Sequence, residues 1–109
     1  MRLILTVALA AITTSTFAQA DSSQFFYQKG IEEKGKGRVM ESYKAFDKAY
    51  AYNKSDKQVI ESLAQTLFDL RRYPQAREKY VELEKLGAPS AHTLKQLMNI
   101  SFNLRQFND

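Results

Sequence analysis

The feature that most constrains the fold is an internal repeat with a period of about 34 residues. The segment LFDLRRY at residues 67–73 returns as SFNLRQF at residues 101–107, with Phe, Leu and Arg at the same places. The same shift pairs Ile60 with Leu94 and, in the other direction, Tyr80 with Phe46. A fixed period of this length indicates an array of similar structural units that bury their apolar faces against one another.

Small residues also recur with this period and predict closely packed helix pairs. Gly30 pairs with Ala64, and Ser42 pairs with Ala76. Short side chains at these positions let two helices approach each other, while the aromatic residues fill the space beside them.

Helix start and stop signals divide the chain into five expected helices. Asp56 and Ser90 are suited to capping helix N-termini, and Pro74 is suited to a first helical turn. Gly87 is a C-terminal stop signal. The expected helices cover residues 23–34, 38–53, 57–71, 74–86 and 91–106, and no segment has the alternation of a strand.

The unit at residues 57–90 resembles the tetratricopeptide repeat (TPR). The matching residues are Ile60, Leu63, Ala64, Leu67, Ala76, Tyr80, Leu83 and Pro89. Pro89 lies one place later than in the family pattern. In the first unit Lys29 and Glu33 occupy positions that are usually apolar, and that unit has no terminal Pro.

The resemblance implies an all-α fold, a TPR-like right-handed superhelix of antiparallel helix hairpins with about two and a half repeats. The repeats are expected at about residues 23–56 and 57–90, with an incomplete one at 91–109, inside a domain of residues 21–109.

The first twenty residues have the layout of a secretory signal peptide. Arg2 precedes an apolar run at residues 3–12 that is interrupted only by Thr6, and the small-x-small triplet 18–20 provides a cleavage site. We therefore expect residues 1–20 to be removed and the product to be periplasmic or secreted, without an integral membrane span. The alternative, an uncleaved anchor, is disfavoured because a membrane span needs about 20 mostly apolar residues.

Composition and motifs argue against catalysis. The chain has no Cys and one His, which excludes a disulfide framework and disfavours zinc or iron–sulfur sites. His92 has no second His or acidic cluster near it in sequence. The run from Gly30 to Lys36 partly matches a phosphate-binding loop, but Gly37 stands where Ser or Thr is required. We expect no enzyme, no cofactor and no metal.

A basic cluster, Lys34, Lys36 and Arg38, lies in a chain of formal charge +4. The excess is too small for strong phosphate-driven binding, so we expect no nucleic-acid partner. Two interpretations stay open: a solvated turn, or a weak site for anionic envelope polymers.

Members of the TPR family bind peptides or partner helices in a concave groove, so the resemblance implies a protein or peptide partner. The groove positions transferred by repeat alignment are Tyr27, Ile31, Lys34, Glu61, Gln65, Phe68, Asp69, Lys95, Asn99, Phe102 and Asn103. Lys95 and Asn99 match in type one part of the carboxylate clamp of chaperone-binding members, and the other clamp positions do not match.

The last unit is expected to be open. Its apolar residues spread over an arc of about 220° at ~100° per residue, wider than one neighbouring helix covers. The chain is then either the N-terminal part of a longer repeat protein or a small protein that self-associates through residues 91–109. The functional alternatives are a scaffold module with a peptide-binding groove and a structural segment of a larger envelope protein that stacks on further repeats.

Overall fold

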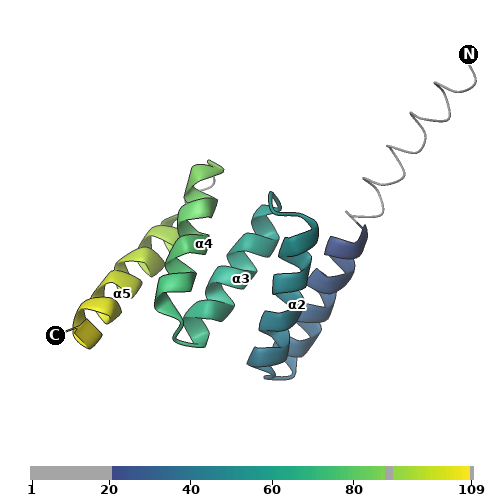
Figure 1. The fold of residues 1–109 in the computed structure, drawn as a ribbon, viewed down its shortest axis with the longest axis horizontal. Helices are drawn as coiled ribbons and strands as arrows, with labels where there is room; N and C mark the ends of the chain where they lie inside the picture. The colour runs from purple at the N-terminus through teal and green to yellow at the C-terminus, as the bar shows by residue number, and fades with distance from the viewer. Residues whose placement is uncertain (1–20, 88–89, 109) are drawn as a thin grey trace, which may run out of the picture.

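The computed structural model describes residues 21–87 and 90–108, with the side chains of residues 107 and 108 excepted, and it contains five helices and no strand in those ranges. An N-terminal helix covers residues 21–35. It is followed by α2 (Val39–Tyr52), α3 (Lys57–Asp69), α4 (Tyr73–Lys85) and α5 (Ala91–Asn108). Figure 1 shows the helices side by side in chain order, each antiparallel to the one before it. The all-α prediction is confirmed, and every described helix end lies within two residues of its expected position.

The first hairpin is held by small residues that face a buried aromatic ring. The Ser42 hydroxyl donates to the Gly30 carbonyl at 3.0 Å, and the Ser23 hydroxyl donates to the Ala49 carbonyl at 2.9 Å. Gly30 lies directly against the fully buried Phe46 ring, since an added Cβ would be 2.5 Å from it. The N-terminal helix therefore approaches α2 as closely as the backbone allows.

The second hairpin forms the centre of the apolar core. Its buried members Leu63, Ala64, Leu67, Ala76 and Tyr80 form one cluster that also includes Phe46 from α2 and Ile100 from α5. A residue from each flanking helix thus reaches the same cluster. Packing between α3 and α4 is what joins the two ends of the array.

The predicted caps are present. The Asp56 carboxylate accepts from the backbone N–H of Gln58 at 3.0 Å, and the Ser90 hydroxyl accepts from the N–H of Thr93 at 3.1 Å. Each cap satisfies an N–H group that has no partner within its own helix. Gly87 has a positive φ and follows the end of α4 as expected.

α3 ends two residues before its expected end because Arg71 adopts a left-handed conformation. Its φ is 60°, and the next N–H, of Arg72, donates back to the Leu67 carbonyl at 2.9 Å. This is the geometry that glycine usually provides at a helix C-terminus.

A charged cluster connects the two hairpins on the side of α2 and α4. The Tyr50 hydroxyl donates to both carboxylate oxygens of Glu82, at 3.0 and 2.9 Å. The Lys79 ammonium lies 4.0 Å from the centroid of the Tyr50 ring and 3.3 Å from the Glu82 carboxylate. The three groups satisfy one another between the first and second hairpins.

The expected signal peptide, residues 1–20, lies outside the described residues, as does Pro89. None of the described helices is both long enough and apolar enough to cross a membrane.

Gly30→Ala is expected to destabilise the fold by about 1–3 kcal/mol, because the new methyl group overlaps the buried Phe46 ring. This loss occurs although Ala is favoured over Gly in a helix by about 1 kcal/mol. Urea unfolding followed by circular dichroism measures the change.

Gly35→Ala is the matched control, since Gly35 is also helical and an added Cβ there meets nothing within 4 Å. It should leave stability unchanged or raise it. Equal effects of the two substitutions would contradict the close packing of the first hairpin.

Candidate partner-binding face

Gln65 on α3 is the centre of a polar network that reaches α5. Its Oε1 accepts from the Tyr80 hydroxyl at 3.1 Å and from the Gln96 side-chain amide at 2.9 Å. Nε2 of His92 lies 3.1 Å from the same oxygen. This nitrogen donates when it carries the proton. The Gln65 amide nitrogen donates to Asp69 at 3.1 Å. One side chain thus joins α3, α4 and α5.

The network continues along α5 as a row of side-chain amides. Asn99 donates to Gln96 Oε1 at 3.1 Å, and Asn103 donates to the Asn99 carbonyl at 2.8 Å. We call the set Asp69, Gln65, Gln96, Asn99 and Asn103 the amide ladder. Its members are fixed by one another, so the face that they form is ordered without a ligand.

Four of the predicted groove residues belong to this ladder: Gln65, Asp69, Asn99 and Asn103. The structure therefore brings the predicted residues of the second and third units together. The first unit does not join them through a hydrogen bond in the described part of the chain. There Tyr27 packs on the core with its ring centroid 5.8 Å from that of Phe46, while Ile31 and Lys34 are exposed.

The two predicted groove phenylalanines have different surroundings. Phe68 is half-buried, and its ring meets that of Tyr73 edge-on at 5.4 Å. Phe102 is 62% exposed. It follows Leu94 and Met98 in an exposed row of apolar side chains on α5 and is the member of that row nearest to Asn103 in the sequence.

The predicted groove charges are unpaired, whereas the basic cluster is partly neutralised. Glu61, Lys95 and Lys34 form no ion pair within the described residues. In the cluster, Glu33 lies 3.6 Å from Arg38 and 4.0 Å from Lys36. One carboxylate therefore offsets two of the three cations, which favours the solvated turn over a polymer-binding site.

Three members of the network are not predicted by the sequence. Gln96 is only 7% exposed and links Gln65 to Asn99, but repeat alignment places it opposite Gln28 and Ser62, neither of which is a predicted groove position. The sequence places Tyr80 only in the core, and its hydroxyl nevertheless donates to Gln65. From the sequence, His92 is interpreted as an isolated surface residue. The requirement that a buried hydroxyl has a partner is the signal that points from Tyr80 toward a nearby amide.

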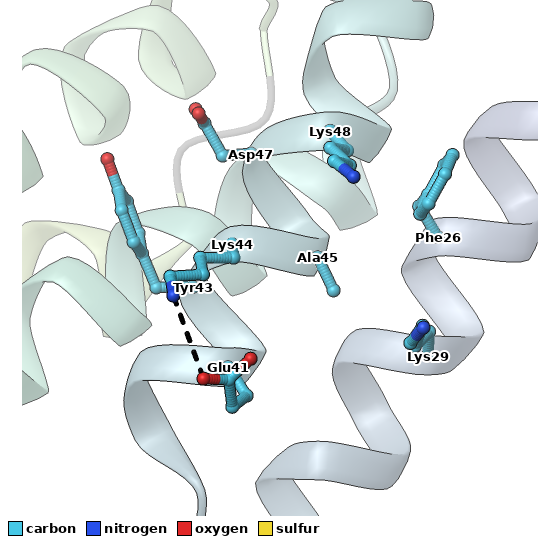
Figure 2. A pocket seen from close by; sticks show the side chains of 8 residues that line it. All are labelled: Phe26, Lys29, Glu41, Tyr43, Lys44, Ala45, Asp47 and Lys48. Carbon is cyan, nitrogen blue, oxygen red and sulfur yellow. Dashed lines mark ion pairs between the residues drawn. The ribbon is translucent and has the colours of Figure 1, made fainter.

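A cavity of about 340 Å³ lies elsewhere, on the first hairpin, and includes no ladder residue. Figure 2 shows Phe26 and Lys29 of the N-terminal helix facing Lys48 and Ala45 of α2 across it. Lys44 pairs with Glu41 at 3.7 Å, and Lys48 lies 5.3 Å from the Phe26 ring centroid. With two of its three cations engaged, the cavity has no strong charge preference.

Two pKa shifts mark the buried polar groups. Burial, assisted by the carboxylates of Glu61 and Asp69, raises the pKa of Tyr80 to about 12. Burial alone would lower the pKa of Lys79, but the Tyr50 hydroxyl and the Glu82 carboxylate outweigh it and raise that pKa.

Among the described residues, no group of three or more His, Asp or Glu side chains is placed to hold a metal ion. No protein-family model matches the sequence, and no curated protein is significantly similar to it. The function is therefore inferred from the chain's own geometry.

Stability should fall as the pH rises from about 10 toward 12. Tyr80 holds its proton more tightly in the folded chain, where its pKa is about 12, than in the unfolded chain, where it is 10.0. Its contribution is complete below pH 10, and about 2 kcal/mol is lost by pH 12. The pKa of Lys79 is also raised in the folded chain, so its deprotonation at high pH lowers stability as well.

Tyr80→Phe should remove Tyr80's share of this dependence, while costing about 1 kcal/mol at neutral pH through the lost hydrogen bond. Urea unfolding at pH 8, 10 and 11 compares the variant with the wild type. If the free energy of unfolding depended on pH in the same way in both proteins, Tyr80 would not be the source of the loss.

Proposed function

We propose that this chain is a protein-interaction module of an exported envelope protein, which binds a peptide or a partner helix on the face formed by the amide ladder. It acts as a scaffold without catalysis. Its helix pairs are proposed to form about two and a half TPR-like repeats of a right-handed superhelix.

The observation that carries this proposal is the unused hydrogen-bonding capacity of the ladder. Asn99 and Asn103 each donate through Nδ2, but their Oδ1 atoms accept no hydrogen bond from the described residues. Half-buried, fixed amides beside an exposed aromatic ring suit an extended peptide. The amides can pair with its backbone, and the ring can hold an apolar side chain.

The neighbouring charges support the same proposal. Glu61 on α3 and Lys95 on α5 lie at equivalent repeat positions, have opposite charges and are both exposed. They add directionality, because a bound peptide can satisfy both only in one orientation.

The similarity of the two hairpins supports the repeat assignment. Gly30 and Ala64 lie one repeat period apart and are both buried small residues. Phe46 and Tyr80 are separated by the same period and are both fully buried. Equal roles at equal spacing are what a repeat predicts.

Selection of peptides from a random displayed library on the purified protein tests the proposal. The affinity of the enriched peptides is then measured by fluorescence anisotropy. Asn99→Ala combined with Asn103→Ala should weaken binding about tenfold or more, since each lost hydrogen bond to a peptide is worth about 1 kcal/mol.

The matched control is Gln75→Ala, which removes an exposed side-chain amide from α4. It should leave the affinity unchanged. Enriched peptides that bind the ladder variant as tightly as the wild type would contradict the proposed binding face.

A further inference from the structure

α5 carries a second, uncovered apolar face. Leu94, Met98 and Phe102 are 50%, 73% and 62% exposed, respectively, and follow one another at every fourth position. At ~100° per residue they lie within about 80° of one another around the helix. We call them the α5 stripe. A continuous row of large exposed apolar side chains usually marks an interaction surface.

The stripe differs from the face through which α5 joins the core. Ile100 is fully buried in the central cluster, and Leu97 and Leu104 pack against that cluster. Around the helix axis, these three residues are separated from Met98 by roughly 100–160°. α5 therefore has one apolar face covered by its own chain and another that needs a cover.

The charged side chains of α5 itself have a single sign. α5 contains Lys95 and Arg105 and no Asp or Glu. Lys95 lies beside the first part of the stripe, and Arg105 follows Phe102 on the next turn of the helix. Neither cation forms an ion pair within the part of the chain that the structure describes.

We propose that the α5 stripe is the docking site for an acidic amphipathic helix of a partner protein. The apolar side of that helix, with residues repeating every three or four positions, covers Leu94, Met98 and Phe102. Carboxylates on its flanks pair with Lys95 and Arg105 and set its position along α5.

A second copy of this chain is a poorer occupant. Two α5 helices packed on each other would bring their four cations and no carboxylate to one interface. The described helices other than α5 present no equivalent stripe. Phe25 and Ile31 of the N-terminal helix are both exposed, but their spacing in the sequence places them on different faces.

This site overlaps the proposed peptide-binding face at Lys95 and Phe102, but Leu94 and Met98 belong to the stripe alone, and the two asparagines belong to the ladder alone. Asn99 and Asn103 lie about 100–140° around the helix from Met98. Substitution of Met98 therefore tests the stripe, and substitution of Asn99 and Asn103 tests the ladder.

Two synthetic helical peptides test the proposal. They share one apolar stripe of Leu residues and differ only at the flanking positions, which are Glu in the first and Lys in the second. Binding to the purified protein is measured by fluorescence anisotropy at low and high salt. The Glu peptide should bind about tenfold more tightly, because two exposed charge pairs together change from repulsive to attractive.

Two variants locate the binding. Met98→Glu should weaken the Glu peptide about tenfold or more, by placing a carboxylate in the apolar contact. Lys95→Glu with Arg105→Glu should reverse the preference, so that the Lys peptide binds better. The matched control, Lys57→Glu with Arg77→Glu, makes the same charge change at exposed sites on α3 and α4 and should keep the original preference.

Equal binding of the two peptides would overturn the proposal. A reversal of the preference in the control variant would also overturn it, because the net charge of the protein would then explain the preference. Sedimentation that shows a dimer dissociated by Met98→Glu would assign the stripe to a second copy instead. Loss of the Glu peptide in the Asn99→Ala, Asn103→Ala variant alone would assign its binding to the ladder. Circular dichroism of each variant confirms that the helices are retained.

Discussion

The hydrogen bond from Tyr80 to Gln65 is the interaction through which the apolar core orders the polar face of the structure. Tyr80 is fully buried in the cluster that joins all the hairpins. Its hydroxyl must therefore have a partner inside the protein. The Gln65 side-chain oxygen, 3.1 Å away, is that partner. Gln65 then holds Gln96 and, through it, the row of asparagines. The order of the surface therefore originates in the core.

The same arrangement explains why the protein has two kinds of surface on one helix. Along the ladder, α5 presents amides that are already fixed by hydrogen bonds. On another side, it presents Leu94, Met98 and Phe102 without a cover. The first surface suits a ligand with an exposed backbone, and the second suits a helix with its backbone groups already paired.

The helices could be predicted from the sequence because their signals are local. Asp56, Ser90 and Gly87 act within one turn of their own positions, and the repeat period fixes which residues face one another. The end of α3 could not be predicted, because a left-handed Arg71 has no signal of its own when glycine is the usual residue there.

The ladder was only partly predictable for a different reason. Repeat alignment finds residues that occupy equivalent places, and so it found Gln65 with Asn99 and Asp69 with Asn103. Gln96 aligns with Gln28 and Ser62, and His92 aligns with Gln24 and Gln58, so the alignment alone does not single them out. Their interactions run between helices, and predicting them requires the distance between α3 and α5 to be known. Phe102 shows that residues at equivalent repeat positions can still have different surroundings. Its alignment with Phe68 is sound, but Phe68 meets Tyr73 while Phe102 is exposed.

The most direct test of the central claim is to follow the side-chain amide signals of the protein by NMR during titration with a selected peptide. The account predicts that the Asn99 and Asn103 NH₂ signals shift in proportion to peptide binding, while that of the exposed Gln75 on α4 stays in place. A saturating peptide that shifts Gln75 and leaves both asparagines unchanged would contradict it.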